Sequence, residues 1–236
     1  PRSTQGVSSA ASDVYKRQNC DRDMMVAVER ITGRRPALVW HKESQLDPVD
    51  IVIIPGGFSF GDYLRCGALA ARAPAMEAVI DHASRGGAVL GVCNGFQILL
   101  ETGMLPGILV RNSGLKFVCR ETRLAVQETI DSPFLSDLST GTELRIPVAH
   151  NEGNYFADDE LLDSLEQSGQ IAQRYVENDP TRAANPNGSA RNIAGILSAN
   201  GRVMGMMPHP ERAMGNGHDS EDGRKFLTSV LEGVAR

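Results

Sequence analysis

Cys93 stands between two apolar runs in residues 88–100, AVLGVCNGFQILL. The pattern predicts a short buried strand that turns sharply at the cysteine into a helix. Such a turn needs small residues two positions before and after the nucleophile, where Gly91 and Gly95 stand. The amides at the start of the helix would favour the thiolate over the thiol. A structural cysteine in a core strand would give the same pattern, so the elbow alone leaves both interpretations open.

His209 and Glu211 stand in a second motif, PHPE, at residues 208–211. A thiolate that attacks an amide needs a base that takes up its proton and then protonates the departing ammonia, a role that suits histidine near neutral pH. In an extended segment, Glu211 would share a side with His209 and could orient its ring. The motif alone could be a surface loop with an incidental histidine. Together with the elbow, it predicts a cysteine–histidine–glutamate site.

A third string, IVIIPGGFS at residues 51–59, runs from a predicted strand into a glycine-rich turn. Amide hydrolysis passes through a tetrahedral oxyanion, which preorganised N–H groups stabilise. The amide of Asn94, directly after Cys93, can supply one donor, and the turn at Gly56 and Gly57 can bring a second. A tight turn with no further role is the simpler interpretation of this string by itself.

The three strings PGGFS, GVCNGFQ and PHPE together resemble those of the class I, triad-type glutamine amidotransferases. Longer strings are similar to the glutaminase subunits of bacterial phosphoribosylformylglycinamidine synthases: GGFSFGDYLRCG at 56–67, RNSGLKFVC at 111–119 and PVAHNEGNY at 147–155. The resemblance runs from Asn19 to the last residue. It implies a doubly wound α/β fold with a mostly parallel sheet, helices on both faces and the nucleophile at an elbow.

The resemblance also implies residue roles. Glutamine would be hydrolysed at Cys93, with His209 as the base and Glu211 orienting it. The residues that would line the glutamine pocket are Gly57, Phe58, Asn94 and Gln97. Further contacts would come from Arg111, Asn112 and His150.

The ammonia would pass to a separate synthetase subunit, which converts formylglycinamide ribonucleotide to formylglycinamidine ribonucleotide in purine biosynthesis. We expect no cofactor on this chain, because ATP and Mg would be used by the synthetase, and we expect a small third subunit in the complex. Alternatives are a stand-alone cysteine hydrolase of related architecture and a glutaminase subunit of another amidotransferase. The long strings and Gln97 favour the first interpretation, and the presence of all three triad residues disfavours an inactive scaffold.

Composition sets outer bounds on function. The chain has 236 residues, of which 41% are hydrophobic, and a formal net charge of −5. Mixed charges with an acidic balance argue against nucleic acid and anionic membranes as partners. No apolar stretch approaches the roughly 20 residues of a membrane span, and no signal-peptide region stands at the start, so we expect a cytoplasmic protein. The four cysteines lack metal-ligand spacing, so we expect reduced thiols and no metal, with Cys66 and Cys119 serving packing.

Strands and helices that alternate along the chain would position these motifs. Predicted strands cover 37–40, 51–54, 172–176, 194–197 and 203–207, and residues 115–146 form a β-rich stretch. Predicted helices cover 22–33, ending at Gly33, then 74–82 and 219–234. This alternation favours an α/β doubly wound sheet whose catalytic loops lie at the carboxyl ends of the strands.

The first 18 residues depart from the family pattern. The turn at residues 19–23 matches, but residues 1–18 are polar and lack the apolar run of a central strand. We therefore expect a foreign or disordered segment at 1–18, with at most residues 10–15 in contact with the core, and an amidotransferase domain at 19–236. The sheet would then lose one strand.

Overall fold

A mixed nine-stranded sheet crosses the computed structural model, which describes residues 3–8, 20–57, 67–177, 183–215, 217 and 220–236. Its strand order is β2-β1-β3-β4-β11-β10-β9-β6-β7. The parallel half consists of β2 (Ala37–Trp40), β1 (Ser3–Ser8), β3 (Val49–Ile54), β4 (Ala88–Val92) and β11 (Val203–Met206). Antiparallel pairing then adds β10 (Ile193–Leu197), β9 (Ile171–Val176), β6 (Val118–Val126) and β7 (Glu143–His150).

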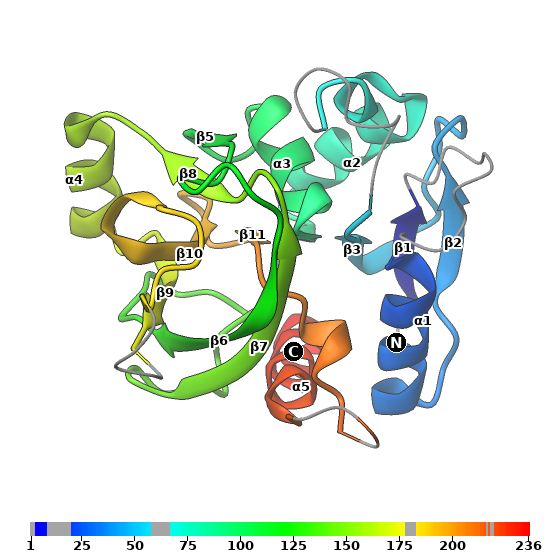
Figure 1. Ribbon diagram of the computed structural model, residues 1–236. Helices are drawn as coiled ribbons and strands as arrows, with labels where there is room; N and C mark the ends of the chain where they lie inside the picture. The colour runs from blue at the N-terminus through cyan, green and yellow to red at the C-terminus, as the bar shows by residue number, and fades with distance from the viewer. Residues whose placement is uncertain (1–2, 9–19, 58–66, 178–182, 216, 218–219) are drawn as a thin grey trace.

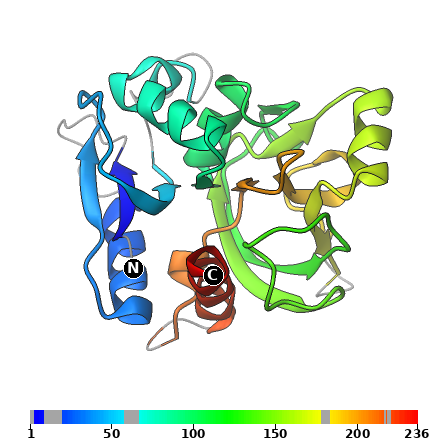
Figure 2. The same cartoon turned by 180° about the vertical axis from the view of Figure 1, so that it is seen from behind.

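Helices cover both faces of the parallel half. Figures 1 and 2 show α2 (Pro74–Ser84) and α3 (Asn94–Glu101) on one side of β3 and β4, and α1 (Asp21–Thr32) and α5 (Asp222–Ala235) on the other. A strand covered on both faces is typically apolar, and every residue of β4 is buried. The predicted α/β fold is therefore confirmed.

Local signals fixed the helix ends where the sequence predicted them. Gly33 adopts φ 69° after α1, and its N–H donates to the Glu29 carbonyl at 2.8 Å, which is the left-handed C-cap that glycine favours. Pro74 is the first residue of α2, where its missing N–H costs no helical hydrogen bond. None of the helices in the described part of the chain has the length and apolar character that a membrane span requires.

A second sheet and a further helix lie outside the sequence prediction. A small second sheet pairs β5 (Ile108–Val110) with β8 (Asn154–Phe156), and α4 is formed by Asp159–Gln167. Asp158 caps α4 by accepting a hydrogen bond from the Leu161 N–H at 2.8 Å, a signal that was available in the sequence. Short 3-10 helices complete the described structure at η2 (Ala70–Arg72), η3 (Ala190–Asn192) and η4 (Pro210–Arg212).

The expectation that residues 1–18 would supply no strand is wrong for Ser3–Ser8. These residues form β1, which lies between β2 and β3 and pairs in parallel with both. Sheet hydrogen bonds join backbone groups, so a polar segment can complete the sheet without the apolar pattern on which the prediction relied. Residues 9–18, including 10–15, lie outside the described residues, and the origin of the segment and the domain boundary at residue 19 remain predictions.

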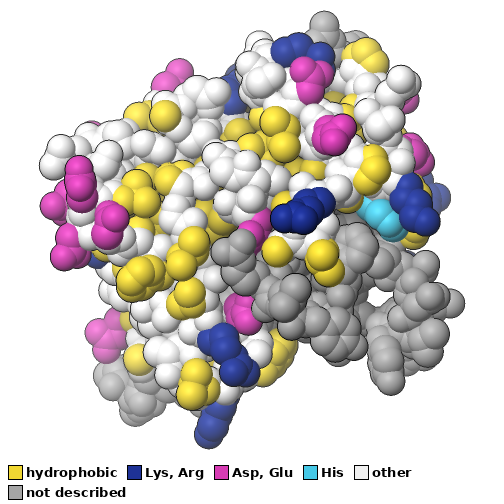
Figure 3. Space-filling view, turned by 90° about the horizontal axis from the view of Figure 1, so that it is seen from above, with side chains coloured by type: hydrophobic (Ala, Val, Ile, Leu, Met, Phe, Trp, Pro, Cys, Tyr) yellow, Lys and Arg dark blue, Asp and Glu magenta, His cyan; other side chains and the backbone are white. Residues whose placement is uncertain are grey.

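The visible surface carries both charge signs. Figure 3 shows acidic and basic side chains interspersed with apolar ones on the face that carries α2 and α3.

Candidate active site

Cys93 occupies a strained turn between β4 and α3. Its φ of 51° and ψ of −104° place a non-glycine residue in a region that L-amino acids rarely adopt. The Cys93 N–H donates to the carbonyl of Met206 at 2.8 Å, so the turn is attached to the end of neighbouring β11. Strain held by surrounding structure is typical of a functional turn, and the predicted elbow is present.

The glycines on either side of Cys93 have the steric reason that the sequence suggested. A Cβ on Gly95 would collide with the carbonyl oxygen of Ile54, at the end of β3. A Cβ on Gly91 would lie 2.5 Å from the side chain of Leu99 in α3. The elbow therefore depends on close backbone approach between three adjacent elements.

His209 and Glu211 form a buried pair after β11. His209 Nδ1 and Glu211 Oε1 are 2.6 Å apart, and their side chains are 2% and 0% exposed. The His209 N–H donates to the Pro147 carbonyl on β7 at 2.8 Å, which fixes the backbone beneath the ring. The carboxylate thus determines how the ring lies. The pairing was expected from an extended segment, but Glu211 lies in the 3-10 helix η4, which begins directly after His209.

Charge around His209 favours its protonated form. Burial lowers the pKa of His209, but the negative charges of Glu211 and of the Cys93 sulfur raise it further, so its pKa lies well above that of a free histidine. Among the described residues, His209 Nε2 makes no hydrogen bond. This nitrogen is therefore the ring atom available to exchange a proton with a nucleophile or a leaving group.

The glycine-rich turn after β3 passes directly against this pair. A Cβ on Gly56 would lie 2.6 Å from His209 Cε1, so only glycine permits the approach. Gly57 follows in the same turn, while Phe58 lies outside the described residues. The structure brings together the three strings that the sequence singled out, at the carboxyl ends of β3, β4 and β11.

Asn94 and Gln97 are buried and bonded to each other. Asn94 Nδ2 donates to Gln97 Oε1 at 2.8 Å, and Gln97 Nε2 donates to the Glu152 carbonyl at 2.8 Å. These bonds join the first turn of α3 to the loop after β7. Contact of either side chain with glutamine remains a prediction.

His150 lies in a separate polar cluster. Its Nδ1 is 3.0 Å from Asn112 Oδ1, which also accepts the N–H of Gly153 at 3.1 Å, and its Nε2 is 3.4 Å from Asn187 Nδ2. Since Asn112 Oδ1 accepts, His150 Nδ1 carries the proton and Nε2 accepts from Asn187. Burial and then the nearby charge of His209 lower the pKa of His150 to about 4. The cluster therefore holds a neutral ring.

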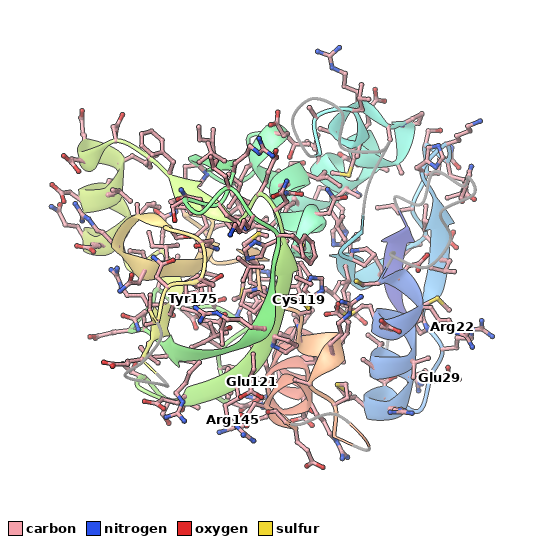
Figure 4. The ribbon with its side chains drawn as sticks, in the orientation of Figure 1. Arg22, Glu29, Cys119, Glu121, Arg145 and Tyr175 are labelled. Carbon is pink, nitrogen blue, oxygen red and sulfur yellow. The ribbon has the colours of Figure 1, made fainter. Side chains whose placement is uncertain are left out.

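Two other predicted residues lie elsewhere. Arg111 is exposed in the loop after β5, and its contact with glutamine remains a prediction. Cys119 was assigned to packing, but it is exposed on β6, where Figure 4 shows it on the same pair of strands as Glu121 and Arg145. Cys66 lies outside the described residues.

Cys20 was missed as a site residue. Its sulfur is buried and accepts a hydrogen bond from Arg212 Nη2 at 3.1 Å. Ligand atoms of Cys20, His209 and Glu211 all lie within 4.8 Å of one another, a donor set that could hold a metal ion. The Arg212 guanidinium puts a positive charge beside that set and opposes a cation there. That the site holds no metal remains a prediction.

Comparison with known proteins places these features in context. A family model described as a CobB/CobQ-like glutamine amidotransferase domain matches residues 14–225. The chain is 51% identical to the phosphoribosylformylglycinamidine synthase subunit PurQ of Zymomonas mobilis, over 96% of this chain and 99% of that one. It is 54% identical to PurQ of a Ruegeria species, over 91% and 93%.

Solved structures agree with these relatives. A chain in the structure of PurLQS from Thermotoga maritima is 40% identical, with a TM-score of 0.81 and coverage of 98% of this chain and 99% of that one. A glutamine amidotransferase from the same organism gives a TM-score of 0.58 at 13% identity, with coverage of 100% and 99%, and this likeness shows the fold alone.

Proposed function

The chain belongs to the family of PurQ subunits of phosphoribosylformylglycinamidine synthase, and we propose that it hydrolyses glutamine at Cys93 to supply such a synthase with ammonia. The observation that carries this proposal is the position of Cys93 at a strained elbow on β4 while the buried His209–Glu211 pair follows β11, the strand beside it. The site has a nucleophile, a base and an orienting carboxylate on adjacent strand ends.

The first half of the reaction forms a thioester. His209 Nε2 holds the proton of the Cys93 thiol, and the thiolate attacks the side-chain amide carbon of glutamine. The amides of Asn94 and Gly57 stabilise the oxyanion of the tetrahedral intermediate. The intermediate collapses when the C–N bond breaks and His209 returns the proton to the leaving nitrogen, which departs as ammonia. Glu211 holds Nδ1–H throughout and stabilises the charged ring.

The second half restores the enzyme. His209 Nε2 takes a proton from water, which attacks the thioester carbon. The C–S bond then breaks, glutamate leaves, and the Cys93 thiolate again lies beside protonated His209. No cofactor takes part in either half.

The ammonia would be used by a separate synthetase subunit. A Thermotoga maritima relative occurs in a structure titled PurLQS, which supports a complex with a synthetase and a third subunit. We place the ATP- and Mg-dependent conversion of formylglycinamide ribonucleotide to formylglycinamidine ribonucleotide on the synthetase, and the complex in the cytoplasm.

Replacement of Cys93 in the reconstituted complex tests this function. Cys93→Ala should abolish synthesis from glutamine, while synthesis from high concentrations of ammonia should survive because the acceptor chemistry lies on the partner. Cys119→Ala, which removes an exposed thiol from β6, is the matched control and should keep both activities. A Cys93→Ala complex that still uses glutamine would refute the assignment.

A further inference from the structure

Cys20 connects the start of α1 to the glycine-rich turn. Its N–H donates to the Gly56 carbonyl at 3.1 Å, and its own carbonyl accepts the N–H of Met24 at 2.9 Å. The residue thus begins α1 and at the same time holds the turn after β3. Its side chain points into the protein and is buried.

Arg212 reaches from η4 to two atoms of the α1 segment. Its Nη2 donates to the Cys20 sulfur at 3.1 Å, and its Nε lies 3.6 Å from Asp23 Oδ2. The Arg212 N–H also donates to the His209 carbonyl at 3.1 Å. One side chain therefore joins the segment that carries the histidine to the first turn of α1.

The Cys20 sulfur, the Gly56 backbone and the His209 ring meet at one point. A Cβ added to Gly56 would lie 2.6 Å from His209 Cε1 and 3.4 Å from the sulfur. The sulfur is also within 4.8 Å of a His209 ring nitrogen and a Glu211 oxygen. The imidazole is thus bounded by a carboxylate, a thiol and a backbone segment, and it has no free space to turn into on the Gly56 side.

The electrostatics keep Cys20 distinct from the nucleophile. Burial raises the pKa of the Cys20 thiol above its usual value, although His209 and Arg212 act to lower it. The neutral thiol accepts a hydrogen bond from Arg212 and leaves the His209–Glu211 ion pair intact. The two cysteines also differ in backbone position, because Cys20 is the N-cap residue of α1 whereas Cys93 occupies the strained turn before α3.

From this arrangement we propose that Cys20 and Arg212 form a clamp that fixes the His209 imidazole against Glu211 in its working orientation. The inference rests on the proposed glutaminase function. In this clamp, Cys20 is a positioning residue, because it acts through His209 and not on glutamine. Loss of the clamp should therefore slow turnover and leave glutamine binding nearly unchanged.

The test compares Cys20→Ala, Cys20→Ser and the control Cys119→Ala in the reconstituted synthase. We expect Cys20→Ala to lower kcat with glutamine on the order of tenfold, with KM changed by less than about twofold. Cys20→Ser should recover most of the loss because its hydroxyl oxygen also accepts from Arg212. Synthesis from ammonia should be equal in all three variants.

A pH profile separates positioning from a general structural defect. The groups that face His209 are Glu211 and Arg212 from η4, Cys93 from the elbow, Cys20 from α1 and His150 from β7. The Cys20 side chain acts to raise the pKa of His209, so its removal should move the pH dependence of kcat/KM for glutamine to lower pH.

The outcomes distinguish failure of the clamp proposal from failure of the proposed glutaminase function. If the unmodified complex uses ammonia but not glutamine, the proposed function fails. If it uses glutamine and Cys20→Ala matches it in kcat and pH profile, the clamp is refuted. If Cys20→Ala loses ammonia-dependent synthesis as much as glutamine-dependent synthesis, the clamp is also refuted. If that variant does not fold, Arg212→Lys is tested in its place.

Discussion

The carbonyl of Pro147 accepts the backbone N–H of His209 at 2.8 Å, and this bond joins the two halves of the sheet at the candidate active site. Pro147 belongs to the antiparallel strand β7, whereas His209 follows the parallel strand β11. The position of His209 therefore depends on the antiparallel half, and so does that of Cys93, whose Sγ lies 3.9 Å from the Ala149 carbonyl oxygen on the same strand β7.

His209 and Glu211 should differ in their importance for catalysis. Without the ring there is no base, while without the carboxylate the ring remains but is less well oriented. We expect His209→Ala to lower glutamine-dependent kcat on the order of 10³-fold or more, and Glu211→Gln clearly less. Steady-state kinetics of the complex measure both, and equal losses would contradict the assigned roles.

His150 should make stability depend on pH. Its pKa is about 4 in the folded protein and near 6.5 when unfolded, so between these values the unfolded chain binds more protons and folding weakens as pH falls. The full shift corresponds to roughly 3 kcal/mol. The asparagine in His150→Asn does not titrate, so only the unmodified chain should lose stability in this way as the pH falls. The difference in unfolding free energy between the two chains should therefore shrink from pH 7 to pH 4.5 in denaturant titrations.

Gly95→Ala should damage the elbow. The new Cβ would collide with the Ile54 carbonyl oxygen, and backbone cannot rotate away as a side chain can. We expect a loss of about 1–3 kcal/mol in unfolding free energy together with loss of glutaminase activity. Gly114→Ala is the matched control, since nothing lies within 4 Å of a Cβ there. Equal stability of the two variants would rule out the steric argument.

The isolated chain should be a poor glutaminase. A subunit that hydrolysed glutamine without an acceptor would waste it, so we expect the site to be completed by the partner. Glutamate release by the purified chain should be slow and should rise when the synthetase, its nucleotide and its substrate are added. Full activity of the isolated chain would favour a stand-alone hydrolase.

The parallel half of the fold could be predicted because each of its central strands carries its own signal. Residues 51–54 of β3 and all of β4 form apolar runs, α1 ends at a glycine, and the elbow glycines follow from sterics within a short segment. The exception is β1, whose sequence lacks an apolar run although the strand pairs with both β2 and β3. Strand signals in side chains cannot reveal such a segment.

Contacts between site residues far apart in the sequence could not be predicted. Cys20 and Arg212 meet across 192 positions of sequence, and His150 and Asn187 meet across 37. Nothing local to Cys20 separates it from a buried structural thiol. The triad was accessible because the elbow and the PHPE motif each carry a chemical reason of their own.

The place of β11 in the sheet has a consequence for the order in which the protein becomes active. It is the last strand along the chain, yet it lies in the middle of the sheet between β4 and β10. A nascent chain that has emerged only as far as β10 already carries Cys93 but has neither the strand that supports its turn nor the base that follows it. Cys93 is therefore synthesised early and His209 late, and we expect a chain whose synthesis stops before β11 to lack glutaminase activity.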